Sequence, residues 1–222
     1  MSLADTTSTA PTPHPDEPTS GIKPLPVGAL VLAAGFSRRF GGSKLLAPLP
    51  GASVTVFEQS LRRLADTLEH IVVVTRPELF DALTILCDKV RNEHANLSLS
   101  LLSFDGAEQG MGASLAFAAQ HIGHWRACLV CLADMPHLSC SSIEAIADEL
   151  SCDNIVIPQY DGQRGHPTGF GSDFFTQLAA STGDRGARAL LTKHADCVIA
   201  LDLTDRGILL DIDTPQDLDL KP

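Results

Sequence analysis

Short apolar runs alternate with segments of helical periodicity along most of this chain, and that alternation limits the folds open to it. Strand-like runs lie at residues 27–33, 71–74, 97–102, 128–132, 155–157 and 198–203. Strands that alternate with helices pair in parallel through right-handed crossovers, and the helices then cover both faces of the sheet. The pattern therefore predicts a three-layer α/β/α sandwich with a mostly parallel sheet.

Helices are predicted between the strands by apolar residues that recur every three or four positions. Two of these segments start at a capping box, Thr55-x-x-Glu58 and Ser141-x-x-Glu144. The apolar positions fall into three groups: Phe57, Leu61, Leu64 and Leu68; Leu115, Ala118, Ala119 and Ile122; Ile143, Ile146, Ala147 and Leu150. In the strand at 97–102 leucines alternate with serines, which predicts less complete burial.

The beginning of the chain differs in composition from the rest. Residues 1–20 are rich in Thr, Ser and Pro and contain no Lys or Arg. Such a segment cannot bury enough apolar surface to offset the entropy of ordering, so we expect a disordered leader at 1–24 and a single domain at 25–222. The leader lacks the features of a secretory signal or a transit peptide, and no run is long enough to span a bilayer. We therefore expect a soluble cytoplasmic protein.

Net charge narrows the range of partners. The chain has 16 basic and 27 acidic residues, which give a formal charge of -11. Nucleic-acid affinity comes mainly from Lys and Arg that neutralise phosphates, so an acidic chain is a poor candidate for a broad nucleic-acid surface. A small phosphate-bearing ligand needs only a few cations, and net charge does not exclude it.

Two of the six cysteines, Cys128 and Cys131, have the spacing of metal ligands. A zinc site needs a second Cys or His pair, which the sequence lacks at a suitable spacing. Both cysteines lie in the strand-like run ACLVCLA, where positions three apart face opposite sides of a sheet. We expect them to be small core residues.

The loop after the first strand has the composition of a phosphate-binding site. Residues 32–44 read LAAGFSRRFGGSK, with three glycines and with cations at Arg38, Arg39 and Lys44. Glycine lets the backbone approach a ligand closely, and exposed amides in such a loop bind phosphate oxygens. The spacing is neither that of a Walker A loop, since Lys44 follows Ser43, nor that of the Gly-x-Gly-x-x-Gly motif. An ordinary Gly-rich turn with solvated cations is the alternative.

Acidic residues lie at the end of a later strand and near the C-terminus. Asp134 follows the fourth predicted strand, and ligands in α/β folds bind at the carboxyl ends of the strands. The segment LLDIDTPQDL adds Asp211 and Asp213. Mg²⁺ takes one or two protein carboxylates together with phosphate oxygens and water, so these residues indicate a metal-bound nucleotide. Alternatively, Asp213 or Thr214 caps a helix that starts at Pro215, and both interpretations can hold.

These segments resemble the motifs of the MobA-like nucleotidyltransferase family and, within it, of the molybdenum cofactor cytidylyltransferase branch. The opening signature is Leu32-Ala33-Ala34-Gly35-x-Ser37-x-Arg39-x-Gly41-x-x-Lys44, and the later ones are Asp134-Met135-Pro136 and Asp211-Ile212-Asp213-Thr214-Pro215. Similar to the acceptor-side motifs of that branch are Arg164-Gly165-His166-Pro167 and Gly183-Asp184-Arg185-Gly186-Ala187-Arg188. The resemblance runs from about residue 28 to residue 218. It implies a Rossmann-like sheet of the nucleotide-diphospho-sugar transferase type.

The resemblance also implies a reaction, namely transfer of CMP from CTP to the phosphate of molybdopterin, with Mg²⁺ as cofactor and pyrophosphate as by-product. Arg39 and Lys44 are the implied catalytic residues, and Asp134 and Asp213 the implied metal ligands. The implied binding residues are Leu32, Ala33, Ala34, Gly35, Ser37, Gly112 and Ser114 for the nucleotide, and Arg164, His166 and Arg188 for the acceptor. The product would pass to a recipient molybdoenzyme or its chaperone. Neither nucleic acid nor a membrane is an expected partner.

Three other functions fit the same residues. The first is guanylyl transfer to molybdopterin, although Gly35-Phe36-Ser37 lacks the extra glycine that such enzymes tend to have there. The second is cytidylyl transfer to a sugar or polyol phosphate. The third is a non-catalytic, cofactor-binding chaperone, but storage would not need Arg39 and Lys44 beside a metal site.

Local structure offers an alternative role for several of these residues. Ser114 could cap a helix instead of contacting the base. Gly165 and Pro167 could close an ordinary β-turn. Asp184 could cap a helix whose start carries Arg188. Met111 and Trp125 are predicted to be packing residues.

Overall fold

The computed structural model describes residues 25–183 and 187–221, and the predicted leader lies outside them. Eight strands form one mixed sheet: β1 (Val27–Ala33), β2 (His70–Thr75), β3 (Ser98–Ser103), β4 (Ala127–Leu132), β5 (Ile155–Tyr160), β6 (Gln163–Arg164), β7 (Thr168–Gly171) and β8 (Val198–Asp202). Their order is β3-β2-β1-β4-β7-β5-β6, with β8 paired to β5. The pairs among β1 to β4 are parallel, as is β5 with β8, whereas β7 is antiparallel to both β4 and β5.

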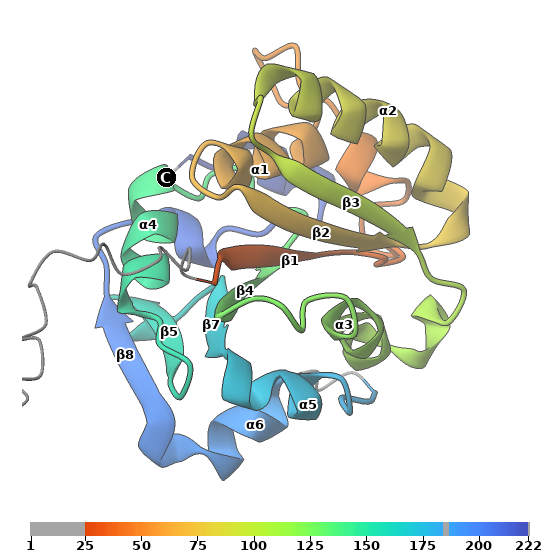
Figure 1. Ribbon diagram of the computed structural model, residues 1–222. Coiled ribbons are helices and arrows are strands. Elements are labelled where there is room, and N and C mark those ends of the chain that lie inside the picture. Colours follow the sequence, from red (N-terminus) through yellow and green to blue (C-terminus); the bar gives the residue numbers. More distant parts are fainter. Residues whose placement is uncertain (1–24, 184–186, 222) are drawn as a thin grey trace, which may run out of the picture.

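Helices cover both faces of this sheet (Figure 1). One layer contains α1 (Val56–Ala65), α2 (Pro77–Glu93) and α4 (Cys140–Glu149). The other contains α3 (Met111–Ala119), α5 (Phe175–Leu178) and α6 (Arg188–Lys193). The predicted three-layer α/β/α sandwich is confirmed, with β7 as an antiparallel strand inside an otherwise largely parallel sheet.

Each central strand contributes to two hydrophobic cores because successive side chains point to opposite faces. In β1, Ala29 and Val31 pack toward α1 and α2, whereas Leu30 packs toward α3. The two cysteines of β4 behave as predicted: Cys131 belongs to the first core and Cys128 to the second, and both are buried. Burial in these apolar surroundings raises the pKa of both thiols, so they are poor nucleophiles and metal ligands.

The helix starts agree only in part with the sequence. Thr55 caps α1 as predicted, because its hydroxyl accepts a hydrogen bond from the Glu58 amide at 3.2 Å. The prediction for Ser141 is wrong: α4 begins earlier, and Ser139 caps it by accepting from the Ser142 amide at 3.2 Å. Ser139 is the cap because its backbone is extended and it directly precedes Cys140, the first helical residue, whereas Ser141 lies inside the helix.

Strand β3 lies at one edge of the sheet, which accounts for its alternating burial. Its leucine-serine alternation correctly indicated incomplete burial. Among the described helices and strands, four have no counterpart in the predictions: the long helix α2, the short helix α5 and the short strands β6 and β7. Helix α2 buries Leu79, Leu83, Cys87 and Val90 at helical spacing and has Pro77 in its first turn, so the signal was present in the sequence.

Strand order brings the end of the chain to the middle of the sheet. β1 and β4 are adjacent and parallel, so the loop after β1 and the residues after β4 leave from the same edge. The segment after β8 then returns to that edge, where the Ile212 amide donates to the Asp134 carbonyl at 3.0 Å. Asp211 and Asp213 flank Ile212 and therefore lie beside Asp134, about 80 positions away in sequence.

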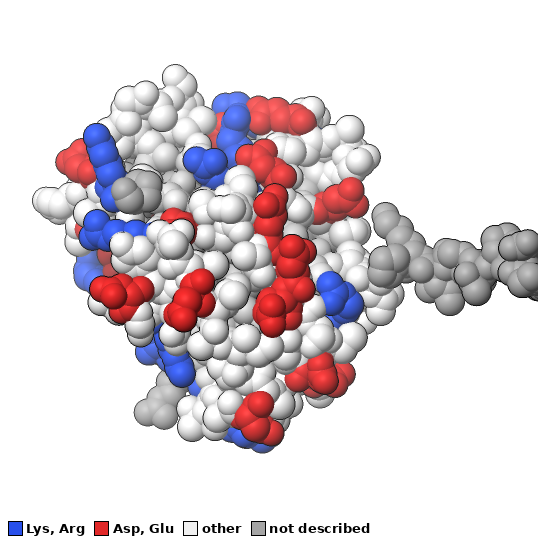
Figure 2. Space-filling model, turned by 90° about the vertical axis from the view of Figure 1, so that its left-hand side faces the viewer, with Lys and Arg blue, Asp and Glu red and all other residues white. Residues whose placement is uncertain are grey.

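The exterior is charged, and on the face that includes α4 and β8 acidic side chains gather over the centre (Figure 2). Basic side chains lie mostly around its margin. This face therefore offers no continuous basic surface for a polyanion. Among the described residues, no helix has both the length and the apolar character needed to cross a membrane.

Gly165 shows how closely the segment before the C-terminal acids packs. A Cβ atom at this position would lie 2.5 Å from the Ile208 carbonyl oxygen and 2.7 Å from Ile208 Cγ1. The next residue, His166, donates its amide to that same carbonyl at 2.9 Å. This close approach leaves no room for a side chain at position 165. It fixes the position of Ile208, from which the chain continues to Asp211.

We expect Gly165→Ala to lower the free energy of unfolding by about 1–3 kcal/mol, because backbone must move to accept the methyl group. Gly123→Ala is the matched control, since a Cβ atom there meets nothing within 4 Å. Its effect should stay within about 0.5 kcal/mol. Urea unfolding followed by circular dichroism measures both variants, and equal losses would contradict the proposed role of the Ile208 contact.

Candidate active site

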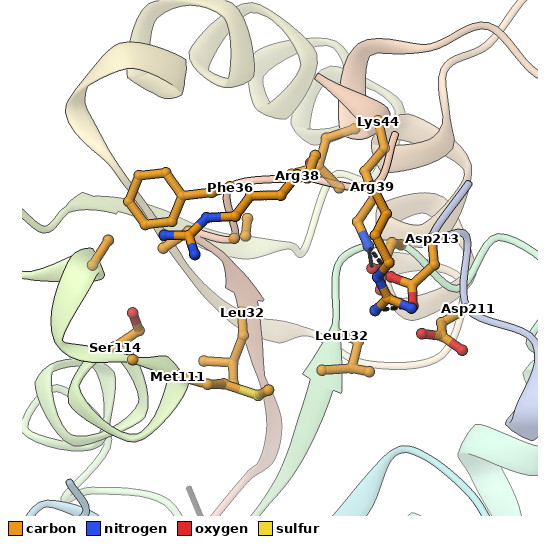
Figure 3. A pocket seen from close by; sticks show the side chains of 18 of the residues that line it. Leu32, Phe36, Arg38, Arg39, Lys44, Met111, Ser114, Leu132, Asp211 and Asp213 are labelled. Carbon is orange, nitrogen blue, oxygen red and sulfur yellow. Dashed lines mark hydrogen bonds and ion pairs between the residues drawn. The ribbon is translucent and has the colours of Figure 1, made fainter. Parts of the chain in front are cut away.

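A cavity of about 600 Å³ opens at the carboxyl edge of β1 and β4 (Figure 3). Its walls come from the loop after β1, the start of α3, the end of β4 and the C-terminal segment. Ten of the residues predicted to act in catalysis, nucleotide binding or metal binding line it: Leu32, Ala33, Ala34, Gly35, Ser37, Arg39, Lys44, Ser114, Asp134 and Asp213. Arg38, Met111 and Asp211, also noted in the sequence, line it as well. Segments far apart in the chain therefore meet around one space.

Lys44 lies at the centre of the charged end of this cavity. Its ammonium is 2.5 Å from Asp134 Oδ2 and 2.9 Å from Asp213 Oδ1. Arg39 reaches the other oxygen of Asp213 at 2.5 Å, but its side chain is 73% exposed, whereas that of Lys44 is 12% exposed. Lys44 is thus a largely buried bridge between two carboxylates, and Arg39 is an exposed cation at the rim.

Burial and charge oppose each other in this cluster. Burial alone would lower the pKa of Lys44, but Asp134 and Asp213 outweigh it and the pKa is raised, so the ammonium is charged at neutral pH. Burial raises the pKa of Asp134, and Lys44 offsets part of that rise. Carboxylates at such a site have lost part of their hydration, and a bound cation offsets the free-energy cost of that loss.

The carboxylates have the arrangement that a divalent cation needs. Asp134, Asp211 and Asp213 each offer an oxygen, and the three oxygens lie within 4.8 Å of one another. Asp134 Oδ1 is buried without a hydrogen-bond partner among the described residues, so this oxygen is left for a ligand. Hard oxygen donors of this kind fit Mg²⁺ or Mn²⁺.

The segment that carries Asp213 is held by its own capping interactions. The Asp217 carboxylate accepts hydrogen bonds from the amides of Asp213 and Thr214, at 3.0 and 2.6 Å. A 3₁₀ helix, Pro215–Asp219, follows with Thr214 as its cap. The capping role that we considered for Thr214 is therefore confirmed, and it exists together with the placement of Asp213 in the cavity.

The loop after β1 leaves space for a ligand beside its backbone. A Cβ atom at Gly35 would meet nothing within 4 Å, so this position opens into the cavity without a steric limit of its own. Ser37 and Gly41 have positive φ angles of 50° and 77°. A non-glycine residue in this left-handed region is held there by its surroundings at a cost of about 1 kcal/mol.

The opposite end of the cavity is less polar. In Figure 3, Phe36, Met111 and Ser114 lie on the side away from the acidic cluster, and Leu32 and Leu132 lie in the floor between the two ends. Met111 is 48% exposed, so its prediction as a packing residue is wrong; Trp125, at 3%, is buried as predicted. Gly110, not Ser114, is the N-cap of α3.

Gly112 and the acceptor-side residues do not line this cavity. The Gly112 amide donates to the Gly183 carbonyl at 2.8 Å, and a Cβ atom would lie 2.7 Å from that oxygen. Arg164 is exposed on β6, and Arg188 begins α6. Residues 184–186, including Asp184 and Arg185, lie outside the described residues.

His166 connects the acceptor-side residues to the acidic cluster. Burial lowers its pKa, Asp211 opposes that shift and Arg188 adds to it, so the imidazole is neutral at neutral pH. Its Nδ1 is buried and has no hydrogen-bond partner among the described residues.

Gly165 has a packing role besides any role in a turn, because its backbone lies against Ile208 as described above.

Several lining residues were not singled out by the sequence motifs. They include Phe36, Leu45, Ala107, Glu108 and Leu132. Phe36, Leu45 and Leu132 are apolar residues within or next to a recognised motif, whereas Ala107 and Glu108 belong to a short 3₁₀ helix before α3 that no motif marked. Their contribution is shape, which depends on how α3 packs beside β1.

Comparisons with known proteins agree with this geometry. Residues 29–198 match the model of the MobA-like NTP transferase domain. The purine catabolism protein PucB of Bacillus subtilis is 31% identical over 192 residues, which cover 85% of this chain and 92% of PucB. The probable molybdenum cofactor guanylyltransferase of Mycobacterium tuberculosis is 30% identical over 140 residues, 63% of this chain and 64% of that protein.

Solved structures show the same fold. Rv0371c of Mycobacterium tuberculosis superposes with a TM-score of 0.70 at 24% identity, over 87% of this chain and 95% of Rv0371c. A cytidylyltransferase of Leptospira borgpetersenii superposes with a TM-score of 0.62 at 17% identity, over 87% and 83% of the two chains. The chain described here belongs to the family of MobA-like NTP transferase domains and is a nucleotidyltransferase of that type.

Proposed function

We propose that this protein transfers CMP from CTP to the phosphate of molybdopterin. The observation that carries the proposal is the meeting of a Gly-rich cationic loop with three carboxylates at one end of a cavity whose other end is less polar. Such a cavity suits a nucleoside triphosphate, with the base near Met111 and Ser114 and the phosphates near Arg39 and Lys44. The resemblance to the molybdenum cofactor cytidylyltransferase branch supports the choice of substrates.

The reaction forms one P–O bond and breaks another. An oxygen of the acceptor phosphate attacks the α-phosphorus of CTP, and the bond from that phosphorus to the β-phosphate bridge breaks, so the electron pair leaves with pyrophosphate. The acceptor is already ionised at neutral pH, so no general base is required. Catalysis of this kind rests on positioning and charge stabilisation.

The side chains in the cavity suit these tasks. Amides of the loop around Gly35 and Ser37 would bind triphosphate oxygens, as backbone nests do. Lys44 and Arg39 would stabilise charge on the α-phosphate and on the departing pyrophosphate. Asp134 and Asp213 would hold Mg²⁺, with Asp211 near enough to contribute. The bound ion would polarise the α-phosphate and orient the leaving group.

The acceptor would enter from the side of His166. This residue lies near enough to Asp211 and Arg188 for their charges to act on its pKa, so it is close to the acidic cluster. Arg164 and Arg188 would supply positive charge for the pterin phosphate, and neutral His166 would donate or accept one hydrogen bond. A recipient molybdoenzyme or its chaperone would then take the product.

Guanylyl transfer to molybdopterin is the second candidate. It is favoured by the 30% identity to the probable molybdenum cofactor guanylyltransferase. Against it, Phe36 stands directly after Gly35, where transferases of that type tend to have an additional glycine. Transfer to a sugar or polyol phosphate is a further alternative, and the similar fold of the Leptospira borgpetersenii cytidylyltransferase makes it worth testing.

Pyrophosphate release distinguishes these candidates. Purified protein is incubated with Mg²⁺, molybdopterin and CTP, GTP or ATP in turn, and pyrophosphate is measured. We expect CTP to be preferred by tenfold or more, about 1.4 kcal/mol of discrimination. A preference for GTP would indicate the guanylyl reaction. Pyrophosphate release only with a polyol phosphate would make that compound, not molybdopterin, the acceptor. No pyrophosphate release with any nucleotide and acceptor would indicate a non-catalytic binding protein.

Asp134→Asn should lower the rate of pyrophosphate release by about 100-fold or more, because a neutral amide loses much of the interaction with a divalent cation. Circular dichroism should show an intact fold, since the amide keeps the size of the carboxylate. Glu144→Gln, on the exposed surface of α4, is the control for removal of one acidic charge. Full activity in Asp134→Asn would remove this residue from the metal site.

Lys44→Met tests whether the ammonium occupies the position of the divalent cation in the metal-free protein. Without it, the carboxylates repel each other, so the midpoint of thermal unfolding in EDTA should fall. Added Mg²⁺ should then raise the midpoint by several degrees more than in the wild type, because no ammonium competes. Lys193→Met, on the exposed side of α6, is the control. An Mg²⁺-induced shift equal to that of the wild type would contradict this role.

A further inference from the structure

Arg76, which is outside the family motifs and does not line the cavity, lies against a residue that does. The Phe36 ring has two guanidinium neighbours: Cζ of Arg76 is 5.1 Å from the ring centroid, and Cζ of Arg38 is 5.8 Å from it. Figure 3 shows Arg38 extended beneath Phe36 toward the α3 side of the cavity. The Phe36 ring therefore packs against Arg76, which follows β2, and lines the cavity together with Arg38.

The Arg76 side chain has few other partners. It is 17% exposed, and its Nε is buried without a hydrogen-bond partner among the described residues. Among the described residues its ion pair is with Glu78: Nη1 lies 3.2 Å from the Glu78 carboxylate, and the Glu78 side chain is 66% exposed. A mostly buried guanidinium needs compensation for lost water, and an aromatic face supplies it. The contact with Phe36 is thus a main reason for this placement of Arg76.

The position of Arg76 follows from the sheet. Ala33 and Thr75 are register partners at the ends of β1 and β2, and the Thr75 hydroxyl donates to the Ala33 carbonyl at 3.2 Å. The two chains therefore leave the sheet side by side, and Arg76 is the first residue after β2. Phe36 is the third residue after β1. The contact joins the two exits above the last register pair.

The loop needs an attachment at this point. Within residues 35–42, one backbone hydrogen bond, from the Phe40 amide to the Ser37 carbonyl at 3.0 Å, stabilises the turn. Ser37 has a φ of 50°, a conformation that neighbouring contacts must maintain. In the second half of the loop, Arg39 and Lys44 form ion pairs with Asp213. In the first half, the Phe36 side chain contacts Arg76, which lies between β2 and α2.

We propose that Arg76 is a positioning residue for triphosphate binding, which acts by holding Phe36 and thereby the first half of the loop in its binding conformation. The inference rests on the proposed function, in which the amides around Gly35 and Ser37 bind phosphate oxygens. Arg76 itself does not touch the triphosphate. A cation–π contact on a largely buried face corresponds to a factor of about 5–30 in a binding constant.

A double-mutant cycle tests the route through Phe36. Binding of inorganic tripolyphosphate, with Mg²⁺, is measured by calorimetry for the wild type, Arg76→Gln, Phe36→Leu and the double variant. Tripolyphosphate has no base, so contacts of Phe36 with a nucleobase do not enter. We expect each single variant to bind about 5–30-fold more weakly, and the double variant to bind no more weakly than Phe36→Leu alone. Additive losses would overturn the proposal, because Arg76 would then act by its charge alone.

Hydrogen exchange of the ligand-free protein provides a second readout. Arg76→Gln should speed exchange of the Phe40 amide, whose hydrogen bond to the Ser37 carbonyl closes the turn, and Arg76→Lys, which keeps the charge and part of the contact, should give an intermediate rate. Glu78→Gln is the matched control: it removes the ion pair, leaves the ring contact, and should change neither exchange nor affinity. Unchanged loop exchange and affinity in Arg76→Gln would overturn the proposal even if the variant is less stable.

The two proposals fail in different ways. If the wild type binds neither tripolyphosphate nor CTP, the loop is not a triphosphate site, and the proposed function fails together with this inference. If the wild type binds both ligands but the cycle is additive, the function stands and only the role of Arg76 is lost.

Discussion

The bridge from Lys44 to Asp134 and Asp213 joins the three segments from which the site is built. Lys44 ends the loop after β1, Asp134 follows β4, and Asp213 belongs to the segment that returns after β8. Bringing two carboxylates together at a buried edge is unfavourable without a cation between them. The Lys44 ammonium fills that need, and the same repulsion would favour binding of a divalent ion.

The sheet makes this bridge possible before any charge is considered. Parallel pairing of β1 with β2 and β4 directs the loops after these three neighbouring strands to one edge, and the Ile212 amide donates a hydrogen bond to the Asp134 carbonyl there. Close packing of Gly165 against Ile208 holds the approach to that segment. Polar chemistry at the edge therefore depends on the hydrophobic layers below it, where alternate residues of β1 enter separate cores.

Local signals predicted the elements whose patterns are continuous and long. The apolar runs marked six of the strands, and Thr55 marked the start of α1. The sequence was less informative where several residues compete, as with Ser139 and Ser141 before α4. Strands β6 and β7 were missed because they are two and four residues long, and β7 enters the sheet through pairing with β4 and β5, a choice made by distant partners.

The chemical groups available for a site can be read directly from the chain: glycines and cations after the first strand, and carboxylates after the fourth and near the C-terminus. Which of these groups meet depends on the three-dimensional arrangement. It joined Lys44 to Asp213 across 169 positions, directed the Gly112 amide to Gly183, and set Arg76 against Phe36. The physical reason is that residue type and periodicity follow local preference, whereas such contacts depend on strand order and on the packing of layers that are far apart in the chain.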